Sequence, residues 1–266
     1  MKDEYLKVAK QAALEAGEII FKYFGKEHKL NYKNNDKSDF TTQADLQAEE
    51  KIVQILTQNF PESNIIAEES GRIQGNCDYT WVIDPLDGTF SFSIGMPYFA
   101  VSIGLLKGDK PILGVIYHVL SKDLYWAEVG SGAFVNKKII IVSKRASLDR
   151  AGVILDYGHL EKRALKTNLY ILPLINKVGH VYSIGSAAMS MVLVGKGIQD
   201  ALINQAWIWD FAAGAVIIEE AGGKVTDFEG KEIDWTKDRL NIIASNGVVH
   251  EQIIKALEDR HANRSR

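Results

Sequence analysis

The chain has very little cysteine: Cys77 is the only one among 266 residues. No internal disulfide can form, and neither a CxxC redox pair nor a zinc site built on several thiolates is available. This scarcity fits a reducing compartment, so we expect a cytoplasmic location.

Long apolar runs and an excess of basic charge are also lacking. No apolar stretch reaches the ~18 residues of a membrane-spanning helix. The charged start M-K-D-E-Y is typical of neither a signal peptide nor a membrane anchor. The formal net charge is −3, which predicts no broad basic surface. We therefore expect a protein that binds neither nucleic acid nor membrane.

Several catalytic motifs are absent as well. The sequence contains no GxSxG, P-loop, GxGxxG or HExxH motif, and its six histidines are scattered along the chain. The chemistry therefore has to come from other residues, and the acidic side chains are the candidates.

The periodicity of apolar residues predicts helices alternating with short strands. Helices are expected at 3–24, 42–60, 186–195, 210–221 and 250–259. Strands are expected at 64–67, 79–83, 153–155, 181–184, 201–204, 225–227 and 242–245, with an antiparallel meander over 99–142. Residues 26–37 form a polar stretch. The alternation in the second half favours a layered α/β organisation. The polar segment 143–150 suggests a boundary between an N-terminal lobe, 1–146, and a C-terminal lobe, 147–266.

The segment W81-V-I-D-P-L-D-G-T-F90 places two carboxylates three residues apart, directly after an apolar run. Aspartate, proline and glycine are common in turns, so Asp84 and Asp87 could belong to a plain turn. Alternatively, a buried strand carries Asp84 to its end, where α/β sites usually lie, and both carboxylates converge on one cation. Gly88 and Thr89 then begin a helix, whose free N–H groups attract a phosphate.

Four other acidic residues, in the segments 39–45 and 68–69, can each be interpreted either as structural or as part of a functional site. Glu68 and Glu69 follow the strand at 64–67 and are either a solvated acidic loop or part of a joint site. Asp45 lies in T42-Q-A-D45, which has the spacing of a capping box. Asp39 has a weaker case and is expected to lie in a loop.

Asp210 stands among aromatic and small residues in W207-I-W-D-F-A-A-G214. It is either the N-cap of the following helix or a partly buried carboxylate that needs a partner. No basic residue is adjacent in sequence, so we favour a metal ion over an ion pair. Trp207 and Trp209 are expected to pack in the core. Ser186 is interpreted as a helix start, with a contact to substrate left open.

Together these segments resemble the inositol monophosphatase family of magnesium-dependent, lithium-sensitive phosphatases. The resemblance rests on W81-V-I-D-P-L-D-G-T-F90, on W209-D-F-A-A-G-A-V-I-I-E-E-A-G-G223, on A67-E-E-S70 and on D39-x-x-T-x-x-D45. It covers nearly the whole chain. It implies an αβαβα layered sandwich, commonly assembled as a homodimer.

The resemblance also implies roles for individual residues. Glu68, Asp84 and the carbonyl of Leu86 would hold a first Mg²⁺, while Asp84, Asp87 and Asp210 would hold a second. Glu68 and water would hold a weaker third ion. Asp45 and Thr89 would orient the attacking water. Contacts to phosphate and substrate are implied for Gly88, Thr89, Gly185, Ser186, Ala187 and Asp210.

One departure concerns the substrate. Inositol-preferring members carry a glutamate seven residues before the aspartate of the second motif, and counting back from Asp210 leads to Ile203. A carboxylate that would accept hydrogen bonds from sugar hydroxyls is thus missing at this place.

The function predicted is Mg²⁺-dependent hydrolysis of a small phosphate monoester, an inositol phosphate or a related polyol or sugar phosphate. The alternatives are fructose 1,6-bisphosphate, histidinol phosphate or a nucleotide as substrate at the same site, or a regulatory protein that retains the fold.

Overall fold

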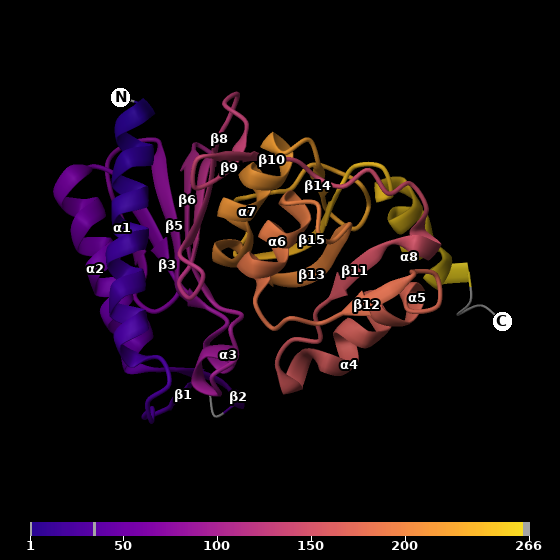
Figure 1. The fold of residues 1–266 in the computed structure, drawn as a ribbon, viewed down its shortest axis with the longest axis horizontal. Coiled ribbons are helices and arrows are strands. Elements are labelled where there is room, and N and C mark those ends of the chain that lie inside the picture. Colours follow the sequence, from indigo (N-terminus) through magenta and orange to yellow (C-terminus); the bar gives the residue numbers. More distant parts are fainter. Residues whose placement is uncertain (1, 34–35, 263–266) are drawn as a thin grey trace.

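The computed structural model of the protein describes residues 2–33 and 36–262. Its elements stack in five layers: a helix pair, a large sheet, a second helix pair, a smaller sheet and an outer group of helices (Figure 1). The expected αβαβα arrangement is confirmed.

The first layer consists of α1 (Lys2–Tyr23) and α2 (Gln43–Asn59), which pack against each other and cover one face of the large sheet. Both helices were expected from their apolar spacing. In the sequence, the two helices are separated by two antiparallel strands, β1 (Asn31–Lys33) and β2 (Asp36–Thr41), which form a hairpin. The sequence predicted only a polar stretch here, because charged and polar residues hide the strand pattern.

Within the described residues, the large sheet has eight strands in the order β10-β9-β8-β7-β6-β5-β3-β4. Their bounds are β3 (Asn64–Ala67), β4 (Gly71–Ile73), β5 (Tyr79–Asp87), β6 (Ala100–Lys107), β7 (Lys110–His118), β8 (Asp123–Glu128), β9 (Ala133–Val135) and β10 (Lys138–Ile140). The predicted meander is confirmed by the antiparallel pairing from β6 to β10. Because β3 runs parallel to β5, both strands end at the same edge.

The smaller sheet has five strands in the described part, in the order β12-β11-β13-β15-β14. Their bounds are β11 (Gly152–Leu155), β12 (His180–Tyr182), β13 (Ala201–Trp207), β14 (Lys224–Thr226) and β15 (Arg239–Ser245). All of these strands were expected, with somewhat different ends.

Helices α6 (Ala187–Gly195) and α7 (Ile208–Glu220) lie between the two sheets, and α8 (His250–Ala262) packs on the outer face of the smaller one (Figure 1). A helical segment that the sequence did not predict joins β11 to β12. It comprises a 3₁₀ turn at 160–162, α4 (Arg163–Lys166), a π-helical turn at 167–171 and α5 (Leu172–Leu174). A further 3₁₀ turn spans 148–150.

Glycine allows α7 to lie very close to the large sheet. A Cβ on Gly104 of β6 would come within 3.0 Å of the Ala212 side chain, and one on Gly114 of β7 within 2.0 Å of the Ala213 carbonyl. The small residues that follow Asp210 complete this close contact. The start of α7, with Asp210, is thereby brought to the end of β5.

The strands of the large sheet come from residues 64–140 and those of the smaller sheet from 152–245. The division into lobes at 146 stays a prediction, since α6 and α7 pack against strands of both sheets. No helix among the described residues combines the length and the apolar character that crossing a membrane requires.

Candidate active site

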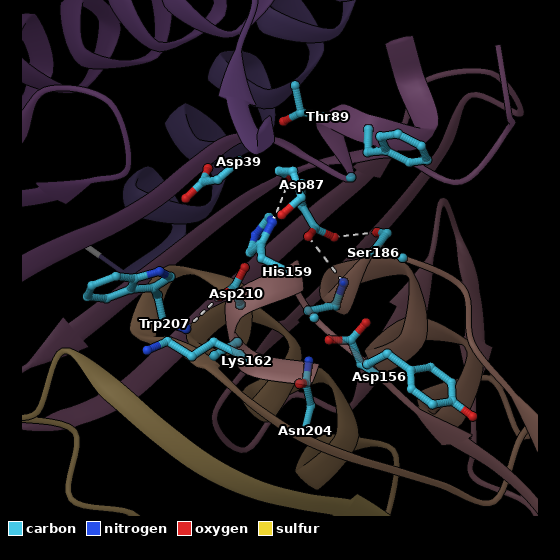
Figure 2. A pocket seen from close by; sticks show the side chains of 18 of the residues that line it. Asp39, Asp87, Thr89, Asp156, His159, Lys162, Ser186, Asn204, Trp207 and Asp210 are labelled. Atoms are coloured by element: carbon cyan, nitrogen blue, oxygen red, sulfur yellow. Dashed lines mark hydrogen bonds between the residues drawn. The ribbon is translucent and has the colours of Figure 1, made fainter. Parts of the chain in front are cut away.

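A pocket of about 580 Å³ opens where β5 ends, between α3 (Thr89–Ser93), the start of α7 and the segment 156–166. Figure 2 shows the carboxylates of Asp87 and Asp210 pointing into it, with Thr89 on one side and Asn204 on the opposite side. The volume lies within the range of small-molecule sites.

Three carboxylates converge at one end of this pocket. One ligand oxygen from each of Asp84, Asp87 and Asp210 lies within 4.8 Å of the others. Asp84 and Asp87 are buried and Asp210 is half-buried. The interpretation as a plain turn is wrong, because β5 continues to Asp87 with an irregular register between the two aspartates.

The carboxylates at this end of the pocket repel one another, because they carry like charges in a buried place. Burial raises the pKa values of Asp84 and Asp210 well above the ordinary value, and neighbouring carboxylates raise them further. Burial also raises the pKa of Asp87 to about 6, although hydrogen bonds from Ser186 and the start of α6 oppose it. Such a cluster favours protons or cations between its members.

Glu68 lines the same pocket, outside the group of three carboxylates whose oxygens lie within 4.8 Å of one another, and its side chain is partly exposed. Its charge raises the pKa values of Asp84, Asp87 and Asp210. The Lys33 ammonium, from the hairpin, lies 2.9 Å from Glu68 Oε1 and 2.8 Å from Glu69 Oε1. Burial lowers the pKa of Lys33, but these two carboxylates outweigh it and raise the pKa. The interpretation of Glu68 and Glu69 as a solvated acidic loop is therefore wrong, because both side chains are partly buried and ion-paired.

The predicted capping box of Thr42 and Asp45 is confirmed, and Asp45 also contacts Thr89 of the pocket wall. Its Oδ2 accepts hydrogen bonds from the Thr42 backbone N–H at 2.8 Å and from Thr42 Oγ1 at 2.5 Å. Its Oδ1 lies 2.9 Å from Thr89 Oγ1, which is also 3.0 Å from the Leu86 carbonyl oxygen. Burial raises the pKa of Asp45 to about 7. A rigid helix start thus holds a carboxylate against the Thr89 hydroxyl.

The start of α6 binds Asp87 through three donors. Ser186 Oγ donates to Asp87 Oδ2 (Figure 2). The backbone N–H groups of Ala187 and Ala188 donate to the same carboxylate at 3.1 and 2.7 Å. Ser186 is also the N-cap of α6, so the interpretation as a helix start is confirmed. Gly185, Ser186 and Ala187 line the pocket.

Gly88 turns the chain from β5 into α3. Its φ is +90°, and a Cβ there would come within 2.6 Å of the Tyr98 carbonyl oxygen. Only glycine fits both demands. The expected helix start after Gly88 is confirmed, because α3 begins at Thr89.

Two expectations about α7 need correction. Asp210 is not the N-cap. Trp207 is the N-cap, and Asp210 Oδ2 accepts its backbone N–H at 2.6 Å. Trp207 is not in the core either, since it is 37% exposed and lines the pocket. It stacks on Trp209 at 5.0 Å, while the Arg239 guanidinium lies 4.3 Å from its ring centroid. Trp209 does pack against the core between the sheets.

The pocket wall opposite the acids contains Asn204, not Ile203. Ile203 is fully buried in the core beneath the smaller sheet, whereas Asn204, the next residue of β13, faces the pocket. Successive residues of a strand point to opposite faces, so counting along the motif selected the wrong side chain. Asn204 Oδ1 accepts from the buried Lys166 ammonium at 2.9 Å, and Lys166 pairs with Asp156 at 2.8 Å.

The sequence analysis missed the ion pair of Lys166 with Asp156 and the ion pairs of Lys33 with Glu68 and Glu69. It also missed the other cations that line the pocket: Lys162, Arg163 and Arg239. Isolated basic residues carry no spacing signal, and only the fold brings them to the pocket. Asp39 also lines the pocket, but it lies on β2 rather than in a loop.

The residues at the acidic end fit a hard cation. All donors that converge there are oxygens, as Mg²⁺ prefers, and the buried carboxylates lack cationic partners sufficient to balance them. The cluster is therefore suited to hold a metal ion.

Comparison with known proteins agrees with this geometry. A model of the inositol monophosphatase family matches residues 1–262. The chain belongs to the inositol monophosphatase family. Its curated relatives include the "Fructose-1,6-bisphosphatase/inositol-1-monophosphatase" of Aquifex aeolicus, 37% identical over 95% of this chain and 94% of that protein. The inositol-1-monophosphatase of Synechocystis is also 37% identical, over 95% of this chain and 88% of that protein.

Solved structures agree on the fold. The extragenic suppressor protein suhB of Bartonella henselae superposes with a TM-score of 0.88 at 33% identity, covering 96% of this chain and 98% of that one. An IMPase of Thermotoga maritima gives a TM-score of 0.84 at 31% identity, with 99% of each chain covered. Family membership makes the protein a phosphoric monoester hydrolase.

Proposed function

We propose that the protein hydrolyses a small polyol or sugar phosphate with Mg²⁺ as cofactor. The observation that carries the proposal is the convergence of Asp84, Asp87 and Asp210 within 4.8 Å, next to Glu68 and to the Asp45–Thr89 pair. A phosphate dianion cannot approach such acids unless cations offset their charge.

Glu68, Asp84, the Leu86 carbonyl, Asp87 and Asp210 are the proposed ligands of two or three Mg²⁺ ions. When bound, the ions supply positive charge that draws the phosphoryl group in and activates water. Four carboxylates and a phosphate dianion sum to about −6, which three divalent cations would balance.

The chain's own groups complete the chemistry. Thr89 Oγ1 can orient the attacking water and pass its proton toward Asp45 Oδ1, 2.9 Å away. A carboxyl whose pKa is raised to about 7 suits a proton acceptor near neutral pH. The backbone N–H groups of Gly88 and Thr89, at the start of α3, are the proposed hydrogen-bond donors to the phosphate oxygens. Gly185, Ser186 and Ala187 form the adjoining wall on the substrate side.

Three further expectations belong to the proposal and rest on the family and on composition: a homodimer, inhibition by lithium and a cytoplasmic location. The single cysteine supports the last of these.

Phosphate release from a panel of esters tests the function. Inositol 1-phosphate, fructose 1,6-bisphosphate, histidinol phosphate and a nucleotide are each incubated with and without Mg²⁺. Mg²⁺-dependent release from a polyol or sugar ester supports the proposal. Hydrolysis of the nucleotide or of histidinol phosphate alone would reassign the substrate, and no release from any ester would contradict an enzymatic role.

A further inference from the structure

The pocket wall opposite Thr89 carries a connected group of three polar side chains: Asp156, Lys166 and Asn204. All three line the pocket, and Figure 2 shows Asp156 and Asn204 on this wall. The Lys166 ammonium joins them, because it donates to Asp156 Oδ2 at 2.8 Å and to Asn204 Oδ1 at 2.9 Å. The proposed hydrolysis at the acidic end uses none of these residues.

The contact with Lys166 fixes the amide of Asn204 in one orientation. An ammonium group only donates hydrogen bonds, so the amide atom that faces it must be the oxygen. Lys166 is itself held in place, because it is 4% exposed and its charge pairs with Asp156. A Cβ on Gly158 would come within 2.7 Å of Lys166 Nζ, so the chain packs closely against the ammonium. The amide nitrogen, Nδ2, therefore points away from Lys166.

This nitrogen is a donor without a partner. Among the described residues, Asn204 Nδ2 makes no hydrogen bond, although Asn204 is only 2% exposed. The next side chain along the strand differs, since Gln205 Nε2 donates to Asn241 Oδ1 at 2.8 Å. A nearly buried N–H group gains most from an acceptor that enters the pocket with a ligand. The wall thus offers a hydrogen-bond donor to the substrate.

The donor lies at a suitable distance from the acids. Asn204 and Trp207 both lie on β13, and the Trp207 backbone N–H donates to Asp210 Oδ2 at 2.6 Å. Three residues of a strand span about 10 Å. A metal-bound phosphoryl group followed by a short carbon chain has a length of this order. Asn204 can therefore contact a substituent of the same ester whose phosphoryl group lies at the acids.

The charges that line the pocket favour an oxygen with negative character at this wall. Lys166 offsets the charge of Asp156, so an anionic group is not simply repelled there. Three further cations line the pocket, and in the described part of the chain no carboxylate lies within 4.0 Å of them: Lys162, Arg163 and Arg239.

We propose that Asn204 selects the substrate by donating to a carbonyl-type oxygen, of a ketone or a carboxylate, close to the phosphorylated carbon. Keto-sugar or sugar-acid phosphates are then preferred over the corresponding polyol phosphates. This inference rests on the proposed phosphatase function and narrows its substrate class. A ketone or carboxylate oxygen only accepts hydrogen bonds, so it matches a fixed donor better than a hydroxyl, which has a hydrogen of its own to place.

Three small phosphate esters test this selection. Glycerol 3-phosphate is the reference. Dihydroxyacetone phosphate has a ketone in place of its C2 hydroxyl, and 3-phosphoglycerate has a carboxylate in place of its terminal hydroxymethyl group. We expect a higher kcat/KM in Mg²⁺ for at least one carbonyl ester than for the reference, after subtraction of the enzyme-free rate. The ester that is preferred tells which oxygen is bound.

Asn204→Asp replaces the donor by an acceptor of the same shape and keeps a partner for Lys166. It should lower kcat/KM for the preferred carbonyl ester about tenfold relative to the reference, mainly through KM. Asn241→Asp is the matched control. It makes the same change on the neighbouring strand β15, outside the pocket lining, and keeps an acceptor for Gln205. The control should leave the ratio unchanged.

The selection is overturned if glycerol 3-phosphate is the best substrate of the three, or if Asn204→Asp leaves the ratio as it is. Hydrolysis of inositol 1-phosphate or another ester of the panel would show in either case that the phosphatase function stands.

If no ester is hydrolysed in Mg²⁺, the proposed function fails and binding decides the role of Asn204 separately. At least one carbonyl ester should then raise the melting temperature of the natural protein more than that of Asn204→Asp, while glycerol 3-phosphate should shift both alike. Equal shifts of the two proteins with all three esters would overturn the role of Asn204 as well.

Discussion

The acidic side chains of the site are held chiefly by backbone N–H groups. Leu86 N donates to Asp84, Trp207 N to Asp210, and the start of α6 to Asp87. Backbone donors fix a carboxylate without neutralising it, so its charge remains available for a cation. The carboxylates are thus oriented, while a proton or a cation still has to balance their charge.

Asp84 is the residue whose loss tests the cluster most directly. Asp84→Asn should abolish Mg²⁺-dependent phosphate release, because the proposed ligand shared by two ions is lost, while circular dichroism stays native. Asp78→Asn, an exposed aspartate just before β5, is the control and should keep full activity. Full activity of Asp84→Asn would remove the two-metal assignment.

Glu49 is a buried carboxylate of α2 that the sequence did not single out. It accepts the backbone N–H groups of Glu69 at 2.8 Å and Ser70 at 2.6 Å, and thereby fixes the turn that presents Glu68. Groups that orient metal ligands commonly contribute 10–100-fold to metal affinity or activity. Glu49→Gln should therefore weaken Mg²⁺ binding about tenfold, as measured by calorimetry.

Glu50→Gln makes the same charge change at an exposed position of the same helix and should leave Mg²⁺ affinity unaltered. Unchanged affinity in Glu49→Gln would assign Glu49 to folding alone.

Among the elements, those with apolar periodicity were predictable and the polar ones were not. The helices 3–24 and 42–60 and the meander follow from spacing and turn residues. The strands β1 and β2 and the helical segment 160–174 were not predicted, because their stability depends on contacts with each other. Ser38, for example, accepts from Leu160 N at 3.0 Å through its hydroxyl.

The hairpin places the Lys33 ammonium where it competes with a cation for Glu68. Lys33→Met should strengthen Mg²⁺ binding about threefold, since a partly exposed ion pair is worth little more than this. Lys29→Met, exposed and earlier on the same segment, is the control. Calorimetric titration checks both, and weaker binding in Lys33→Met would mean that Lys33 supports the ion.

For the whole molecule, Mg²⁺ should be stabilising because it binds only the folded acid cluster. At about 100 times its dissociation constant, the ion should raise the melting temperature by about 5–10 °C for a chain of this size. Asp84→Asn should melt higher than the natural protein without metal at pH 8, because one buried charge is gone, and should lose most of the Mg²⁺ shift. A flat response of the natural protein would contradict a metal site.

The metal-free protein should also become less stable as pH rises from 6.5 to 8. Burial raises the pKa of Asp45 to about 7 in the folded state, so the native protein binds more protons than the unfolded chain until pH passes that value. His250, whose pKa burial lowers to about 4, acts with the opposite sign, chiefly at and below its unfolded pKa of 6.5, so it offsets part of the decline at the start of this range. Asp84, Asp87 and Asp210, whose pKa values burial also raises, contribute to the decline with the same sign. Asp45→Asn should therefore make the decline in melting temperature over this range shallower, and an unchanged slope would exclude Asp45 as one of its causes.

The sequence by itself determined the acid motifs and a layered α/β organisation, because short-range spacing encodes strand ends, helix starts and glycine turns. The resemblance that these motifs carry implied the family and its αβαβα class. Only the tertiary structure decided which side chains face the pocket. In the structure, Asn204 rather than Ile203 faces the pocket, and Trp207 lies at its wall rather than in the core. Lys33, Lys162 and Arg239 lie at the edges of the pocket. These residues are distant in sequence and polar, so no periodic pattern marks them, and packing of the layers alone sets their neighbours.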